Sequence, residues 1–237
     1  MEIIYKIPAH IEIKEKPEVF EFKDRITEET YHAFEKGVQK RRGGMTILVF
    51  DSVGGEIHWG FKCGELIEKY QRAPYNRHFI GIGYNVSSMA VYLYAKCNVR
   101  YMSPEGRIMI HDVICQADHL KKKASDLLQE VKNLCLAAEQ IYAAISQACS
   151  KPKNYIHGLM KEIGNANMYW NVEKAMEHGF VQYDYIPIIT YEVTEKWSMR
   201  SSDPVGNLPL GMKFLFPKDW GPAESCMRAL ASEKKTV

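Results

Sequence analysis

The sequence predicts an α/β fold built on a largely parallel sheet, and three observations carry this prediction. Between residues 19 and 184, short apolar or β-branched runs alternate with segments of helical periodicity. One run, residues 45–51, is apolar almost throughout, as in a strand that is covered on both faces. Residues 117–148 carry one long amphipathic helical pattern. Strands that alternate with helices favour β-α-β units with right-handed crossovers.

The first elements form two strand–helix pairs. Residues 19–24 have the composition of a strand, and Thr27 can cap the helix predicted over 28–40. The apolar strand at 45–51 then leads through a Gly-Gly pair into a second helix, which continues to about Tyr70. Each pair is expected to add one strand to the sheet and one helix to its covering layer.

The pattern repeats in the middle of the chain. Residues 77–85 are predicted as a strand and residues 87–96 as a short helix. Two further short strands are predicted at 99–102 and 107–112. The turn Ser103-Pro104-Glu105-Gly106 separates them.

The long helical pattern at 117–148 places apolar residues every three or four positions. Such a helix is too long for one small core, so part of it is expected to pack against another subunit. Pro152 ends it, and a further helix continues to about Ile163. Asn171 can cap a short helix that reaches Gly179, and the chain is then expected to return as a strand at 180–184.

The organisation along the chain comprises three segments. Residues 1–18 form an N-terminal segment, 19–186 the α/β domain, and 187–237 a C-terminal extension. The extension begins its change of character near the linker-like Ser201-Ser202-Asp203-Pro204 and is rich in Gly, Pro and aromatic residues. It shows neither a helical nor a strand period.

Composition narrows the class of protein. Among the 237 residues, 46% are hydrophobic and 25% charged, and the net charge of +2 gives no electrostatic reason to expect nucleic acid or an acidic substrate. No apolar run is long enough for a transmembrane helix, and no signal peptide is recognisable. The six cysteines lack metal-ligand spacing, so we expect no metal site and a reducing, cytoplasmic setting. Cys135 and Cys149 fall in a helical pattern and are expected to be buried free thiols.

Three segments at predicted strand ends carry the candidate chemistry. They are the Gly-Gly loop at 51–56, the strand-to-helix junction Gly83-Tyr84-Asn85-Val86-Ser87-Ser88-Met89-Ala90, and the strand that ends at His111. Taken singly, each has an ordinary structural interpretation: turn glycines, a serine helix cap, a buried histidine. Their order and spacing together indicate a catalytic arrangement.

These segments resemble the motifs of the Clp protease proteolytic-subunit family. That family has a Ser-Pro-Gly-Gly loop, a Gly-Gln-Ala-Ala-Ser-Met-Gly segment around the nucleophile, and Arg-Val-Met-Ile-His around the base. This chain has Ser52-Val53-Gly54-Gly55, then the junction around Ser88, then Arg107-Ile108-Met109-Ile110-His111. Residues 173–181 are similar to the family's Glu-Ala-x-x-Tyr-Gly-Leu-Val segment, so the resemblance spans about residues 19–186.

The resemblance implies a ClpP/crotonase-like superhelix of β-α-β units with a long handle helix, and a serine endopeptidase. Ser88 matches the nucleophile and His111 the general base, while the backbone N–H groups of Gly55 and Met89 match the oxyanion hole. The family's third triad residue is usually Asp; counted back from Gly179, that position holds Asn167. Asn165 takes the position if the loop register slips by two. An amide can orient an imidazole but cannot stabilise its charge, and Asp→Asn in a serine triad can cost about four orders of magnitude in rate.

Several alternatives stay open at this stage. The chain is a slow peptidase with a Ser-His-Asn arrangement, a catalytically weak or inactive ring subunit, or a crotonase-type enzyme acting on acyl-CoA thioesters. The resemblance further implies a ring-forming homo-oligomer, heptameric or of stacked rings, which cleaves unfolded polypeptides. It implies no cofactor except ATP used by a separate AAA+ unfoldase partner. The C-terminal extension and the divergent motifs are similar to ClpP-like proteins encoded by phages, where maturation of viral proteins is one role.

Overall fold

The computed structural model describes residues 10–13, 17–39, 44–114, 123–164, 166–192 and 212–214. These residues divide into two compact units. The larger unit covers 18–186, and the residues before and after this range belong to the smaller one. The larger unit carries every candidate catalytic residue named above.

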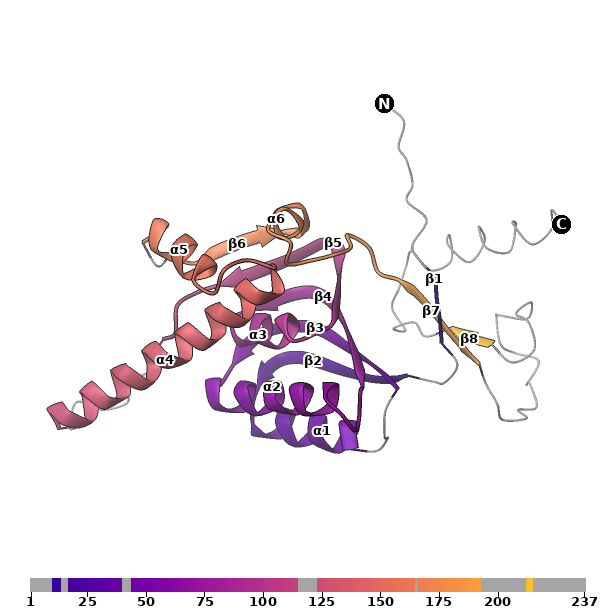
Figure 1. Cartoon of the computed structure of the whole chain (residues 1–237), viewed down its shortest axis with the longest axis horizontal. Coiled ribbons are helices and arrows are strands. Elements are labelled where there is room, and N and C mark those ends of the chain that lie inside the picture. Colours follow the sequence, from indigo (N-terminus) through magenta and orange to yellow (C-terminus); the bar gives the residue numbers. More distant parts are fainter. Residues whose placement is uncertain are drawn as a thin grey trace, which may run out of the picture. The chain divides into compact units, whose positions relative to one another are not determined.

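A five-stranded sheet forms the centre of the larger unit (Figure 1). Its strands follow one another in space as they do in the sequence, in the order β2-β3-β4-β5-β6. The first four are parallel, and β6 runs antiparallel to β5. Their bounds are Glu18–Ile26 (β2), Met45–Gly55 (β3), His78–Ser87 (β4), Val99–Ile110 (β5) and Met168–Asn171 (β6). The predicted α/β class is therefore confirmed, although β6 was not predicted.

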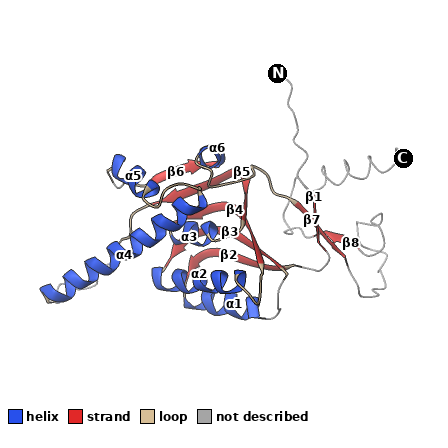
Figure 2. Ribbon diagram, viewed as in Figure 1, coloured by secondary structure: helices blue, strands red, loops and turns tan. Residues whose placement is uncertain are grey.

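Helices α1 (Glu28–Gln39), α2 (Ile57–Gln71) and α3 (Met89–Ala95) connect the parallel strands. They lie side by side against the sheet (Figure 2), with α1 contacting α2 and α2 contacting α3. Since strands and helices both advance by one neighbour per unit, the chain builds a superhelix of β-α units. This is the predicted architecture.

Within the described part of the chain, three further helices follow β5: α4 (Ala124–Ala148), α5 (Tyr155–Glu162) and α6 (Val172–Glu177). Asn171 caps α6 as predicted, since its side chain accepts a hydrogen bond from the Lys174 N–H over 2.9 Å. The long helix begins at Ala124 rather than at 117, and residues 115–122 lie outside the described part of the chain.

Buried Arg100 fixes the C-terminal end of α4 to the sheet. This side chain of β5 is only 5% exposed, and its guanidinium donates to the carbonyl oxygens of Ala148 over 2.9 Å and Cys97 over 2.7 Å. A buried arginine is stable only when its donors are satisfied, and carbonyl groups at helix ends are otherwise without partners. One end of α4 is therefore held rigidly against the strands that carry the candidate site.

Three predictions about elements were wrong. The strands predicted at 99–102 and 107–112 are one strand, β5, which ends at Ile110; its pairing with β4 jumps from Met102 to Arg107, so the predicted turn bulges out of the ladder. Residues 180–184 contain only an isolated bridge between Tyr101 and Tyr183 instead of a strand.

The third error concerns the terminal segments, for which no strand was predicted. The backbone at Ile188–Glu192 (β7) pairs in parallel with His10–Ile13 (β1) and antiparallel with Met212–Phe214 (β8). Strands of three to five residues are too short to show a period in the sequence. The partners β1 and β7 are also almost two hundred residues apart, which local patterns cannot reveal.

Within the described residues, no helix is both long and apolar enough to cross a membrane.

Candidate active site

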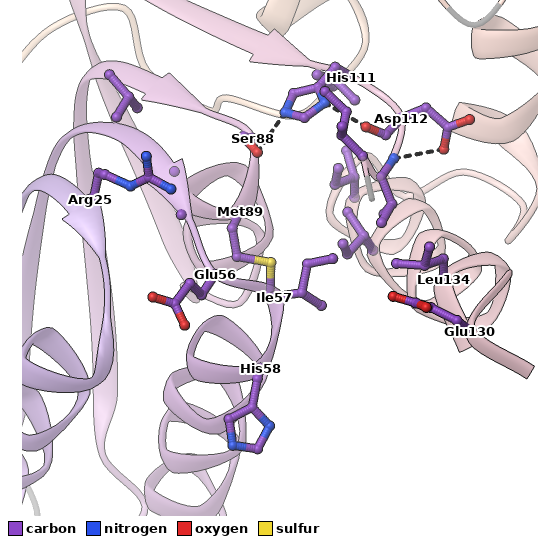
Figure 3. A pocket seen from close by; sticks show the side chains of 18 residues that line it. Arg25, Glu56, Ile57, His58, Ser88, Met89, His111, Asp112, Glu130 and Leu134 are labelled. Carbon is purple, nitrogen blue, oxygen red and sulfur yellow. Dashed lines mark hydrogen bonds between the residues drawn. The ribbon is translucent and has the colours of Figure 1, made fainter. Parts of the chain in front are cut away.

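Ser88 lies at the junction of β4 and α3, in the N-cap position of the helix. Its side chain makes no capping hydrogen bond; the hydroxyl oxygen instead lies 2.7 Å from Nε2 of His111 (Figure 3). The backbone of Ser88 has φ 55° and ψ −125°, a conformation that costs on the order of 1–3 kcal/mol for a residue with a side chain. This geometry does not fit a serine whose purpose is to cap a helix.

His111 directly follows β5, the strand beside β4. The two strands are parallel and Ser87 pairs with Met109, so Ser88 and His111 leave the sheet at the same edge. The Nδ1 atom of His111 lies 2.5 Å from the backbone carbonyl oxygen of Asp112. Because a carbonyl oxygen can only accept, Nδ1 carries the proton and the lone pair of Nε2 faces the Ser88 hydroxyl. A general base needs this tautomer.

The Gly-Gly loop at the end of β3 approaches Ser88 closely. Gly54 has φ 90°, and a Cβ atom added to it would lie 2.5 Å from the Ser88 Cβ atom. A Cβ added to Gly55 would lie 2.3 Å from the carbonyl oxygen of Ile26. Only glycine fits either position, because these separations are shorter than real carbon contacts. The loop therefore brings backbone, rather than side chains, against the serine.

Ser52 shapes this loop, a role that the sequence motif did not reveal. Its side chain is buried, donates to the carbonyl oxygen of Asp24 over 2.5 Å and accepts from the Gly54 N–H over 3.1 Å. Asp24 itself has φ 56° and lies where the β2–β3 register shifts. The hydroxyl thus ties an irregular point of β2 to the first glycine of the loop.

A cavity of about 740 Å³ opens beside Ser88 and His111 (Figure 3). Gly54, Gly55 and Met89 line it together with the Ser–His pair, and α4 supplies one wall. The remaining lining is mainly apolar and includes Ile57, Ile110, Leu134, Ile141 and Ile145. Its charged members are Arg25, Glu56, Asp112 and Glu130. The cavity can therefore hold an apolar side chain of a substrate next to the serine, while the backbone of the same substrate residue contacts the glycine loop.

Comparison with known proteins assigns the family. The family model described as Clp protease matches residues 38–184, more than half of the chain. The chain belongs to the Clp protease family. A search of curated proteins finds no significant match.

Solved structures agree with this assignment at the level of the fold. A ClpP1 mutant from Listeria monocytogenes, with aspartate in place of an asparagine, is 18% identical to this chain with a TM-score of 0.57. The match covers 72% of this chain and 91% of that one. The likeness confirms a ClpP-like fold, and the Clp protease family is one of peptidases.

The third position of the Clp protease triad is where this chain departs most from expectation. Asn167 is exposed, and its amide donates to the hydroxyl of Tyr169 over 3.3 Å. The described residues give His111 a different partner at Nδ1, the Asp112 carbonyl. Asn165 lies outside the described residues. The role of Asn167 in catalysis therefore stays a prediction, and this arrangement does not support it.

Among the described cysteines, the buried ones offer no competing nucleophile. Cys63, Cys97 and Cys149 are buried free thiols, and burial raises the pKa of Cys63 and Cys97 to about 12 and that of Cys149 to about 11. A thiol with such a pKa stays protonated and unreactive near neutral pH. Cys135, predicted to be buried, is exposed because it lies on the outer surface of α4. Among the described residues, no three His, Cys, Asp or Glu side chains gather as metal ligands.

Proposed function

We propose that this chain is a serine endopeptidase that cleaves polypeptides through an acyl-enzyme, with Ser88 as nucleophile and His111 as general base. The observation that carries the proposal is the 2.7 Å approach of the Ser88 hydroxyl to Nε2 of His111. This pairing is what activates a serine hydroxyl, which is a weak nucleophile by itself. A crotonase-type thioester reaction does not need it.

The chemistry follows from the positions of these groups. The Ser88 oxygen attacks the peptide carbonyl while its proton passes to Nε2 of His111, which then returns that proton to the leaving amine. Water repeats the sequence on the acyl-serine and releases the second product. We assign the oxyanion hole to the backbone N–H groups of Gly55 and Met89, which line the cavity beside Ser88. One such donor typically lowers the barrier by about 3 kcal/mol.

The cavity lining suggests which peptide bonds are cut. Val53 and Ile114 line the cavity with exposed apolar side chains, and half-buried Ile57 adds to this apolar surface. An apolar side chain preceding the scissile bond would bury this surface, at about 25 cal/mol per Å². We therefore propose that the enzyme prefers apolar residues at that position of unfolded polypeptides or peptides.

The direct test is active-site labelling with a fluorophosphonate followed by peptide mapping. We expect one adduct, on Ser88, and none in Ser88→Ala. Ser87→Ala is the matched control, because it removes the neighbouring hydroxyl, and it should label like the wild type. An unlabelled wild-type protein, or a label that persists in Ser88→Ala, would refute the proposed function.

We also propose that the chain works as a homo-oligomeric ring fed by an ATP-driven unfoldase. The support is family membership and the exposed apolar side chains of α4: Leu127, Leu128, Val131 and Leu136. Side chains of this kind are commonly covered by a partner. Native mass spectrometry should give a discrete oligomer, and an added unfoldase should stimulate cleavage of folded proteins. Rings that take no label would identify an inactive assembly subunit instead.

A further inference from the structure

The segment after β5 contacts the candidate base through Asp112, a residue that the triad pattern does not include. His111, Asp112 and Val113 lie beyond the end of the strand, so no sheet pairing fixes them. Asp112 nevertheless makes three described hydrogen bonds. Its carbonyl oxygen faces His111, and its carboxylate points to the other side, toward α4 (Figure 3).

The carboxylate of Asp112 is held by two donors. Its Oδ1 atom accepts from the Val113 N–H over 2.8 Å and from the hydroxyl of Tyr142 over 3.1 Å. The first bond closes a tight local turn, and the second ties that turn to a helix thirty residues later in the chain. Together they fix the direction in which the Asp112 carbonyl points.

Tyr142 is a rigid anchor. Its side chain is only 5% exposed, in the C-terminal half of α4 whose end Arg100 fastens to the sheet. Burial and the neighbouring Asp112 carboxylate raise the pKa of Tyr142 above its ordinary value, so the phenol stays protonated and remains a donor. Ile141 and Ile145, which flank it on the same helix, line the cavity.

We propose that Asp112, anchored by Tyr142, positions His111 in place of a third triad side chain. The proposal rests on the proposed peptidase function. The Asp112 carbonyl accepts the Nδ1 proton of His111 and so keeps Nε2 free to receive the Ser88 proton. This aid is geometric: a carbonyl orients the ring without the full charge that a carboxylate would place against the imidazolium. The carboxylate of Asp112 acts indirectly: it accepts the hydrogen bond from Tyr142 that fixes the position of the Asp112 carbonyl.

Four variants, assayed for fluorophosphonate labelling and for kcat and KM on a chromogenic peptide, test this proposal in the full chain. Tyr142→Phe removes only the hydroxyl and should lower kcat about tenfold, the size expected of one hydrogen bond to a charged group. Asp112→Ala should lower kcat about a hundredfold because both bonds to its carboxylate are lost. Asp112→Asn keeps an Oδ1 acceptor and should restore most of that loss.

Tyr155→Phe is the matched control. Tyr155 also bonds through its hydroxyl to one side-chain partner, Nδ1 of His178 over 2.6 Å, and it does not line the cavity. Its loss should leave kcat within about twofold, as expected of a bond that does not reach the reacting groups. In the Tyr142 and Asp112 variants KM should stay near the wild-type value, because a positioning role acts on the proton transfer. A merely structural role would loosen α4 and raise KM.

Each outcome separates the two proposals. A wild-type protein that takes no label overturns the peptidase function and this inference with it. A labelled wild type with wild-type kcat in Tyr142→Phe overturns the inference alone. Asp112→Asn as slow as Asp112→Ala would also overturn it, because the carboxylate charge would then be needed rather than the hydrogen-bond geometry.

Discussion

The Ser88–His111 pair and the segment around Asn167 were both expected to contribute to the same catalytic triad, yet the structure treats them differently. Ser88 and His111 each follow one of two adjacent parallel strands, and they meet at 2.7 Å. Asn167 precedes β6, a four-residue strand antiparallel to β5, and its amide bonds to nearby Tyr169.

The difference shows what makes a site residue predictable. The carboxyl ends of neighbouring parallel strands must meet at one sheet edge, so residues in those two places are brought together by the fold itself. A residue in a turn between a helix and a short edge strand has no such constraint. Its position depends on local hydrogen bonds, which the count of residues from a motif does not reveal.

The largest effect should come from removing the base. His111→Ala takes away the proton acceptor of Ser88, and we expect kcat to fall by about 10⁴-fold or more. His32→Ala is the control, since His32 lies on the surface of α1 and does not line the cavity. If His111→Ala retained more than about a tenth of wild-type kcat, His111 would not be the base, and the contrast with Asn167 would be lost.

Gly54→Ala should produce the next largest effect. The new Cβ atom would lie 2.5 Å from the Ser88 Cβ atom, on a backbone with φ 90°, so the loop must move away from the serine. We expect kcat to fall by about 10²–10³, the range seen when an oxyanion donor is displaced. Rates of peptide hydrolysis, measured alongside circular dichroism, would separate a loss of catalysis from a loss of folding.

Gly158→Ala is the matched control for that substitution. Gly158 lies within α5 and a Cβ atom added there meets nothing within 4 Å. Alanine in a helix interior should stabilise the fold by about 0.5–1 kcal/mol without changing kcat. If both variants lose activity equally, close approach to Ser88 is not the reason for the glycine at position 54.

Ser52→Ala tests whether the Ser52 hydroxyl holds the glycine loop in place beside Ser88. The variant loses the bridge between the Asp24 carbonyl and the Gly54 N–H. We expect about a tenfold lower kcat and an unfolding free energy lower by about 1 kcal/mol. Thr46→Val is the control on the same strand, because the buried Thr46 hydroxyl has no hydrogen-bond partner among the described residues. It should leave stability unchanged or higher, and equal losses in both variants would argue against the bridge.

Much of the larger unit was predictable, because its strands and helices are long enough to show their periods. Residues 45–51 formed β3 and the helical pattern before Cys149 formed α4. Two strands with Ser88 and His111 at their ends then defined the candidate dyad. The Ser88 hydroxyl could not be distinguished from a helix cap by its position alone; the hydrogen-bond partner decides between them.

What the sequence did not reveal depends on contacts between distant residues. The Tyr142–Asp112 bond joins residues thirty positions apart, and no local pattern signals it. The strands β1 and β7 pair across most of the chain. Asp112 was predicted to be the last residue of a strand at 107–112; since β5 ends at Ile110, its carbonyl is free to turn toward the histidine.

The smallest effect is expected at Asn167, where the comparison is sharpest. Since the amide of Asn167 is exposed and bonds to Tyr169 rather than to His111, Asn167→Ala should change kcat by less than about threefold. Asn167→Asp should bring no gain. Were position 167 the third triad member, an aspartate there would stabilise the imidazolium and could raise the rate by orders of magnitude, as the cost of Asp→Asn in a serine triad implies. A gain above tenfold in Asn167→Asp, measured by single-turnover acylation, would move the orienting group from the Asp112 carbonyl to position 167.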